Sequence, residues 1–370
     1  MIRFQLLRKL TLFMLCTLLL VNALQAATSA PLSTASPQPV EVKVFIAAMF
    51  EIGENSGDKP GEFQFWYERY FAETSNTFSI DVPGALNKVF CNEDGICGSV
   101  LGMGKVGSSS SLQAILLHPG LQFNNAYFLL SGVAGTPPSK GTIGDVSIAT
   151  YVIDYDLGHR WAKGEVPDGQ PLFMPRKGYE AIRCYAMPIT LTKLAKNVIS
   201  NVKLEDDPTA KAYRQRYGSA QSNKTPSVIF GTHVTGDTFF HGPGLSNEAQ
   251  YISELYQTDD YVITEMEASA LMQVLSRHQL EHRAISLRAA VNFDQGHSEE
   301  STLAHLDPAP GETAGGFVQS LRNMYVVGEA MTDALSKNWT HWKTLSPEQL
   351  MQKGAATTAC KIDTSKLVKQ

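Results

Sequence analysis

The chain has 370 residues, of which 43% are hydrophobic and 18% are charged, and its formal net charge is −5 at pH 7. This composition is typical of a globular enzyme or binding protein. The acidic balance excludes nucleic acid and anionic lipid as expected partners, because both would repel the protein.

The N-terminus resembles an export signal in its order of residues. Basic residues precede a hydrophobic run from Leu10 to Val21, and small residues follow around Ala26. This order predicts a secretory signal peptide over residues 1–26, with an uncleaved anchor as the alternative. We therefore expect an exported protein, periplasmic or secreted, with no stable membrane insertion after cleavage. Residues 27–40, rich in Pro, Ser and Ala, are predicted to form a linker.

Four cysteines follow the predicted signal peptide, namely Cys91, Cys97, Cys184 and Cys360. An even number of cysteines in an exported chain indicates disulfide bonds. Cys91 and Cys97 enclose a short, turn-rich segment and are expected to form a local bridge. Cys184 and Cys360 are the remaining pair.

The first predicted strand runs from Val42 to Met49 and is apolar and β-branched. A polar loop with Glu51 and Glu54 follows it. In open α/β sheets ligands bind beyond the carboxyl ends of the strands, so this loop is a candidate binding segment. The aromatic stretch over residues 63–71 is predicted to be a helix that packs into the core.

A glycine-rich segment follows at Gly102, Gly104 and Gly107. The spacing fits a dinucleotide fingerprint, but the acidic residue that should hold the ribose about twenty positions later is missing. We therefore predict no nicotinamide cofactor and interpret the segment as a tight turn before a serine-rich helix. The next strand, from Ala126 to Leu130, leads into a glycine turn whose backbone N–H groups can approach a ligand.

Residues 150–225 have the weakest pattern and are predicted to be an insertion or lid. After them, a strand ends near Thr235 and leads to Phe239 and Phe240. An aromatic pair at the end of a strand can stack on a flat base or pack into the core, and the residues alone leave both interpretations open.

The segment from Val262 to Leu275 is expected to be a buried strand that leads directly into a helix. Glu265 and Glu267 flank Met266 at the junction. Two carboxylates there could accept hydrogen bonds from the hydroxyl groups of a ribose, or could simply complement the helix dipole. A further strand over residues 284–291 is followed by Asn292 and Asp294, and a helix is predicted over residues 316–335.

Several common chemistries lack support in the sequence. The segment from His278 to His282 fits the H-x-x-E-H zinc pattern, but it lies where a helix should end, so we predict no metal site. There is no G-x-S-x-G, P-loop or C-x-x-C motif. Conventional serine hydrolase, nucleotide triphosphatase and thiol chemistry are therefore not expected.

Six blocks, taken together in their order, resemble the nucleoside phosphorylase and nucleosidase superfamily, and within it the purine nucleoside permease family. They are AAM at residues 47–49, GMGKVG, SGVAGTPPSKGTIGDVSIAT, VTGDTFF, EMEASA and RAAVNF. The resemblance covers about residues 42–335. It implies one three-layer α/β/α domain over residues 41–345 with a twisted central mixed sheet, followed by a C-terminal tail over residues 346–370.

The resemblance also implies roles for individual residues. Glu267 would hold the ribose, Met266 would pack under the sugar, and Phe239 would lie against the purine. Asn292 stands where nucleosidases usually have the aspartate that protonates the base, and Asp294 could compensate. The predicted substrate-binding residues are Met49, Gly132, Val133, Ala134, Phe239, Phe240, Glu265, Met266 and Glu267, and the predicted catalytic residues are Glu51, Asn292 and Asp294.

Departures from the family pattern bear on the reaction. Phosphorylases of the superfamily carry an arginine where this chain has Leu130, and the first loop has no arginine either. Nucleosidases instead position water with a glutamate in that loop, for which Glu51 and Glu54 are the candidates. We therefore expect hydrolysis of a purine nucleoside, without a cofactor. Phosphate remains an alternative co-substrate, with Arg160 or Arg288 as substitute ligands.

A second hypothesis comes from a different functional class. The protein could be a non-catalytic receptor that delivers purine nucleosides to an inner-membrane transporter, as the name permease suggests. Members of the superfamily commonly form homo-oligomers, but the predicted insertion could block an interface, so the sequence leaves the oligomeric state open.

Overall fold

The computed structural model describes residues 38–72, 76–175, 178–308, 314–352 and 360–367. The predicted signal peptide and most of the predicted linker lie outside the described residues. From Pro39 onward the chain forms one compact unit.

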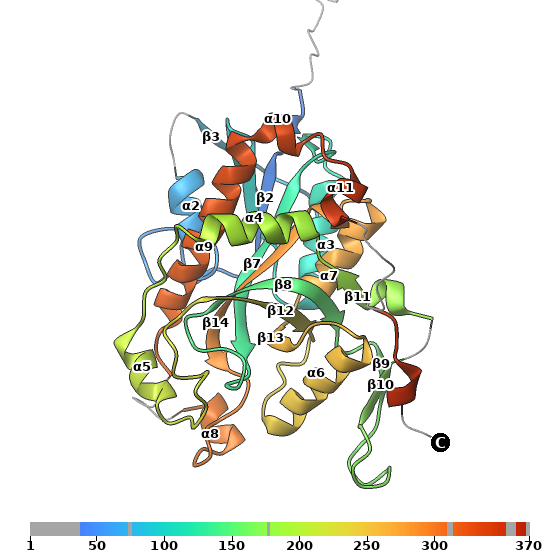
Figure 1. Ribbon diagram of the computed structural model, residues 1–370. Coiled ribbons are helices and arrows are strands. Elements are labelled where there is room, and N and C mark those ends of the chain that lie inside the picture. Colours follow the sequence, from blue (N-terminus) through green and yellow to red (C-terminus); the bar gives the residue numbers. More distant parts are fainter. Residues whose placement is uncertain (1–37, 73–75, 176–177, 309–313, 353–359, 368–370) are drawn as a thin grey trace, which may run out of the picture. The chain divides into compact units, whose positions relative to one another are not determined.

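Helices are interspersed among the strands along the chain, and the C-terminal part after the last strand is helical (Figure 1). The strands are β1 (Val40–Glu41), β2 (Val44–Ala48), β3 (Thr77–Ile80), β4 (Val89–Asn92), β5 (Ile96–Val100), β6 (Leu121–Gln122), β7 (Tyr127–Thr136), β8 (Val146–Asp154), β9 (Gly158–Arg160), β10 (Phe173–Pro175), β11 (Cys184–Ala186), β12 (Val228–Thr235), β13 (Tyr261–Glu265) and β14 (Ala284–Phe293). The α-helices are α2 (Gln64–Tyr70), α3 (Gly104–Leu116), α4 (Ile189–Ile199), α5 (Pro208–Arg214), α6 (Pro243–Leu255), α7 (Ala268–Arg277), α8 (Thr302–Leu306), α9 (Phe317–Lys337), α10 (Trp339–Trp342) and α11 (Pro347–Met351), and short 3₁₀ turns are η1 (Glu180–Ile182), η2 (Glu281–Arg283) and η3 (Thr364–Lys366).

The central sheet contains ten strands and is mixed. Five of them are paired in a closed ring. Strand β14 is parallel to β7 and antiparallel to β8, β12 is parallel to both β8 and β13, and β13 meets β7 in an antiparallel bridge. Strands β2, β5, β4 and β3 extend the sheet from β7, and β11 extends it from β8.

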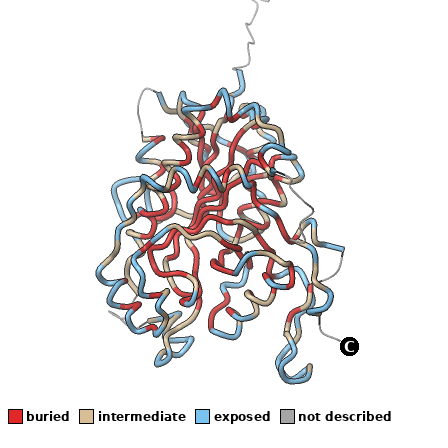
Figure 2. Tube along the Cα trace, in the orientation of Figure 1, coloured by how far each residue is buried: buried red, intermediate tan, exposed pale blue. Residues whose placement is uncertain are grey.

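Helices cover both faces of this sheet, which gives the three-layer α/β/α arrangement. Alternate residues of a strand point to opposite faces. Phe45 and Ala47 of β2 accordingly pack into the cluster that contains α3 and α7, whereas Val44 and Ile46 pack into the cluster with α2, α4 and α9. Figure 2 shows that the central strands are the most buried part of the chain. The predicted fold is confirmed.

The segment predicted to be an insertion or lid, residues 150–225, contributes in part to the central sheet. The segment contains the end of β8, which pairs with β12, and the whole of β11, which pairs with β8. Helix α4 packs into the same cluster as α9, and α5 supplies Tyr213 to a small cluster around Phe293. Strands β9 and β10 form a separate antiparallel hairpin.

The local bridge expected between Cys91 and Cys97 is present, and the remaining two cysteines are bonded to each other as well. Cys91 and Cys97 join the adjacent strands β4 and β5, and Cys184 of β11 is bonded to Cys360 in the C-terminal segment. The second bridge ties together residues 176 positions apart. None of the helices within the described ranges has the length and apolar character needed to span a bilayer.

Candidate functional site

A cavity of about 170 Å³ lies where β13 and β14 end, beside the second half of β7. We call it the central cavity. Its lining residues come from seven separate segments of the chain: Met49, Phe50, Glu62, Met103, Val133, Ala134, Gly135, Thr238, Phe239, Thr264, Glu265, Met266, Glu267, Val291 and Asn292. Eight of the twelve predicted site residues are among them.

Two glycines of β7 mark the two ends of this cavity. Gly132 pairs with Arg288, and Gly135 pairs with both Thr264 and Asn292. Three residues of a strand span about 10 Å, so these two groups of side chains are separated along the cavity. We call them the acidic end, with Glu62, Glu265, Glu267 and Arg288, and the aromatic end, with Phe239, Thr264 and Asn292.

Gly132 itself does not line the cavity, but it makes the acidic end possible. A Cβ atom at this position would lie 2.5 Å from Arg288 Nη1 and 3.0 Å from Glu62 Oε1. Any other residue would therefore displace one of these charged groups. The same measurement shows that Arg288 and Glu62 approach each other across this glycine.

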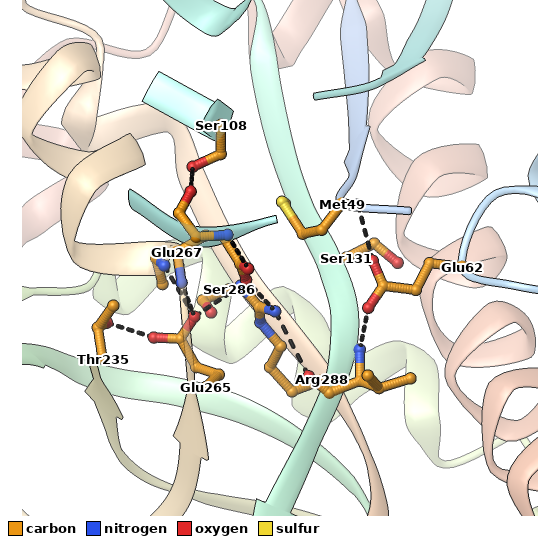
Figure 3. Close-up of polar contacts among 12 residues, drawn as sticks. Met49, Glu62, Ser108, Ser131, Thr235, Glu265, Glu267, Ser286 and Arg288 are labelled. Carbon is orange, nitrogen blue, oxygen red and sulfur yellow. Dashed lines mark hydrogen bonds and ion pairs between the residues drawn. The ribbon is translucent and has the colours of Figure 1, made fainter. Parts of the chain in front are cut away.

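Arg288 is the buried cation of the acidic end (Figure 3). Its side chain is 1% exposed, and it forms ion pairs with Glu265 Oε2 at 2.7 Å and with Glu267 Oε2 at 3.1 Å. Burial alone would lower the pKa of Arg288, but the carboxylates of Glu265, Glu267 and Glu62 raise it. The arginine therefore stays charged and compensates the glutamates, which would be costly to bury unpaired.

The two glutamates of the EMEASA block have different surroundings. Glu265 Oε2 accepts hydrogen bonds from the backbone N–H groups of Glu267 and Ala268 at 2.9 and 2.8 Å, and Oε1 accepts one from the Thr235 hydroxyl. Glu265 thus holds the start of α7 in place. Glu267 accepts from Gly104 N at 2.9 Å in addition to its contact with Arg288, and burial raises its pKa.

Glu62 is the residue at the acidic end that the sequence interpretation missed. Its Oε2 accepts a hydrogen bond from Met49 N at 2.7 Å, and its Oε1 accepts one from Val133 N at 2.6 Å (Figure 3). Burial raises the pKa of Glu62 to about 8, although Arg288 acts in the opposite direction. A carboxyl group with this pKa can exchange a proton near neutral pH.

Glu51, the candidate chosen from the same loop, points elsewhere. Its carboxylate accepts hydrogen bonds from the backbone N–H groups of Phe63 at 2.8 Å and Gln64 at 2.5 Å, and from that of Gly61. These groups form the start of α2, where a carboxylate complements the helix dipole. Glu51 lies on an adjoining cavity of about 480 Å³ that shares Met49, Phe50 and Met103 with the central cavity.

The aromatic end carries an exposed ring and an amide. Phe239 is 54% exposed, which leaves its ring available for a ligand. Phe240 points away and is buried against Tyr155, with the ring centroids 4.7 Å apart. Asn292 lines the cavity, while its Nδ2 donates to the carbonyl of Phe293 at 2.8 Å.

Asp294 lies behind this end and is not a lining residue. It is fully buried and accepts a hydrogen bond from the Tyr261 hydroxyl at 2.9 Å. Burial raises the pKa of Asp294 to about 6. The structure places it so that it supports the end of β14, whereas Asn292 contacts the cavity.

The glycine-rich turn before α3 binds the protein's own carboxylates. Gly104 N donates to Glu267, and Lys105 N donates to Asp237 Oδ1 at 2.6 Å. The Lys105 ammonium group lies 3.0 Å from Asp154 and 2.7 Å from Asp156. This helix start therefore positions Glu267 and the loop after β12.

The residues in the described ranges contain no cluster of three histidine, cysteine, aspartate or glutamate side chains arranged to hold a metal ion. His278 follows the last residue of α7, and His282 lies in the separate turn η2. The two histidines of the H-x-x-E-H pattern are therefore not on one continuous helix.

Comparison with known proteins agrees with the resemblance seen in the sequence. A family model described as purine nucleoside permease matches residues 41–347. A probable purine nucleoside permease of Schizosaccharomyces pombe is 26% identical over 283 residues, which are 69% of this chain and 80% of that protein. A purine nucleoside permease of Candida albicans is 24% identical over 350 residues, 86% of this chain and 79% of that protein.

Two solved structures with a similar fold illustrate the structural likeness. A 5′-methylthioadenosine/S-adenosylhomocysteine nucleosidase of Helicobacter pylori is 17% identical, with a TM-score of 0.51, and the match covers 80% of this chain and 100% of that one. The corresponding putative enzyme of Francisella philomiragia is 16% identical, with a TM-score of 0.51 and coverage of 79% and 98%. At this identity the likeness establishes the nucleoside phosphorylase-like fold.

Proposed function

Because this chain belongs to the purine nucleoside permease family, we propose that its central cavity binds a purine nucleoside and hydrolyses the N-glycosidic bond. The ribose would lie at the acidic end, where Glu267 accepts hydrogen bonds from its hydroxyl groups and Met266 packs against it. The purine would lie at the aromatic end against Phe239. The products would be the free base and ribose.

The observation that carries this proposal is the placement of Glu62. Its carboxylate is fixed by two backbone N–H groups and has a pKa of about 8. In its ionised form it can take a proton from a water molecule as the water oxygen bonds to C1′ of the ribose. Glu267, which lines the same end of the cavity, would hold the sugar in position for that attack, and Arg288 behind it compensates the charge of Glu267.

Departure of the purine base requires stabilisation of the charges that develop as the glycosidic bond breaks. As the C1′–N9 bond breaks, its electron pair moves into the purine ring, and the sugar takes on oxocarbenium character. Carboxylates of the acidic end stabilise the positive charge on the sugar. A hydrogen bond from Asn292 to N7 would stabilise the negative charge on the base, which then takes up a proton from the surrounding water.

The same geometry favours water over phosphate as the attacking group. The backbone N–H groups of Met49 and Val133, which could bind an anion, already donate to Glu62. Among the described residues, the lining of the central cavity includes three glutamates and no lysine or arginine. Phosphate would therefore meet like charges at short range.

A second candidate function is a receptor that binds purine nucleosides without cleaving them. The family name and the amide of Asn292, where a nucleosidase would have an acid, favour this alternative. Under either proposal the N-terminal 26 residues would direct export to the periplasm or beyond. A receptor would then pass its ligand to a transporter in the inner membrane.

One experiment separates these functions. The purified protein is incubated with adenosine, inosine and guanosine, with and without phosphate, and free base, ribose and ribose 1-phosphate are measured. Hydrolysis predicts base and ribose at a rate independent of phosphate. Tight binding by calorimetry without any release of base would establish the receptor instead, and the absence of binding would reject both.

A further inference from the structure

A second cavity of about 160 Å³ adjoins the aromatic end. We call it the side cavity. Phe239 and Asn292 line both cavities, and His241, His305, Glu300 and Tyr213 line the side cavity alone. The group of a bound purine that extends past Asn292 would therefore enter a space surrounded by imidazoles and a carboxylate.

The chemistry of the purine ring identifies that group. N7 and the substituent on C6 lie on the same edge of the base. If Asn292 contacts N7, as the proposed function requires, the C6 substituent is the next group along that edge and points toward the side cavity. This inference rests on the proposed function for the placement of the base. It adds a preference for one class of purine.

Hydrogen bonds assign the protons along a chain that leads to His241. The Tyr217 hydroxyl donates to the carbonyl of Gln295 at 3.0 Å, so it accepts from His305 Nε2 at 3.3 Å. The proton of His305 is then on Nε2, and its Nδ1 is an acceptor. Since His305 Nδ1 contacts His241 Nε2, the proton of His241 is on Nε2.

This assignment leaves His241 Nδ1 as a bare acceptor. His241 is 9% exposed, and within the described part of the chain its Nδ1 is buried without a hydrogen-bond partner. Burial lowers the pKa of His241 and of His305 to about 4, so both imidazoles are neutral at pH 7. A buried acceptor without a donor is costly, and a ligand N–H group would satisfy it.

Glu300 presents acceptors to the same space. Its Oε2 accepts a hydrogen bond from the Tyr213 hydroxyl at 3.1 Å, so that hydroxyl group has no second hydrogen to donate to a ligand. The polar lining of the side cavity thus consists mainly of acceptors. A 6-amino group offers two N–H donors, whereas a 6-oxo group is itself an acceptor.

We propose that the side cavity, through His241 Nδ1 and Glu300, selects 6-amino purine nucleosides such as adenosine over 6-oxo purine nucleosides such as inosine and guanosine. Purine riboside, which has hydrogen at C6, should rank between the two classes. Purine riboside has no N–H donor at C6, but it also has no oxygen acceptor there that would face the acceptors of the protein.

The test measures dissociation constants of adenosine, purine riboside and inosine by calorimetry for the intact protein and three variants. His241→Leu removes the acceptor, and loss of one such hydrogen bond should reduce the adenosine preference about tenfold. His241→Asn places an amide oxygen near the position of Nδ1 and should restore most of the preference. His341→Leu, at an exposed histidine of α10, should leave all three constants unchanged.

Each outcome decides a different point. Equal affinity for adenosine and inosine, or a preference that His241→Leu leaves intact, would overturn the selection by the side cavity while the proposed function stands. Failure of every purine nucleoside to bind would overturn the proposed function, and this inference with it.

Discussion

The two ends of the central cavity are built on opposite electrostatic principles. At the acidic end, three glutamates surround one buried arginine, and backbone N–H groups fix the position of each carboxylate. At the aromatic end, the groups that face a ligand are a ring and an amide, and the neighbouring histidines are neutral at pH 7.

This difference follows from what each end would do. Breaking a glycosidic bond creates charge on the sugar, and fixed charges in a dry site stabilise it effectively. Choosing between purines requires only that hydrogen-bond donors meet acceptors. Neutral groups do this without the cost of burying additional charge. We therefore expect substitutions at the acidic end to change rates and stability, and those at the aromatic end to change selectivity.

The largest expected effect is that of Glu62→Gln. The substitution keeps the size of the side chain but removes the base, so kcat should fall by about 10² to 10⁴-fold while nucleoside binding is retained. Glu51→Gln is the competing test, because Glu51 was the candidate from the sequence. It should weaken the start of α2 and lower the melting temperature with kcat nearly unchanged. The opposite pattern would assign the base to Glu51.

Arg288→Met should be the most destabilising change at the acidic end. Removal of one partner leaves Glu265 and Glu267 buried without their counter-charge, which typically costs about 3–5 kcal/mol. Urea unfolding measures this loss directly. Arg277→Met, at an exposed arginine in the last turn of α7, serves as the control and should cost less than about 1 kcal/mol. Similar losses for both variants would mean that the buried ion pairs contribute little.

The pH dependence of hydrolysis gives an intermediate effect. Only ionised Glu62 can act as a base, and its pKa is about 8. Below that pH, kcat should therefore fall about tenfold for each unit of pH, and above it kcat should level off. A pH profile measured with saturating adenosine would show this limb. A kcat that stays constant between pH 6 and 8 would exclude Glu62 as the general base.

Glu267→Gln should have the smallest of these effects. The ribose would lose a charge-assisted hydrogen bond, which is worth about 1.5 to 3 kcal/mol. Calorimetric titration with adenosine measures the loss of affinity. Glu254→Gln on the exposed side of α6 is the matched control and should leave the affinity unchanged. Unchanged affinity of Glu267→Gln for adenosine would show that the ribose does not bind at the acidic end.

Most of the fold could be predicted from the sequence, because its signals are local and cover most of the domain. The apolar strands and the amphipathic C-terminal helix each have a recognisable pattern. The glycine turn predicted after Leu130 was wrong, because Gly132 and Gly135 lie within the continuous strand β7. The EMEASA block also identified Glu267 and Met266 correctly as residues beside a cavity. The motif alone made Glu267 recognisable, although its contacts with Gly104 N and Arg288 come from distant parts of the chain.

Glu62 could not be identified in the same way. Its role depends on contacts with Met49 N, 13 positions earlier, and with Val133 N, 71 positions later. The loop after β2 contains several glutamates. Glu51 is nearer to the end of the strand than Glu62, so the sequence alone favours Glu51 as the catalytic residue. A useful signal was the position of Glu62 immediately before the aromatic helix, since a buried Phe63 and Trp66 draw the preceding residue into the interior.

The prediction for Phe240 was wrong. The sequence does not distinguish the two neighbouring aromatic residues, and only Phe239 of that pair faces the central cavity.

The closed ring of strands has a consequence for the order in which the protein assembles. Strand β14 completes the ring by pairing with β7 and β8, and it is also the strand that carries Arg288. Until residues 284–293 have been synthesised, the glutamates of the EMEASA block have no buried counter-charge. Docking of one strand therefore closes the sheet and neutralises the site together. A chain truncated before β14 should consequently fail quality control in the cell, because it retains both an open sheet edge and uncompensated acidic residues.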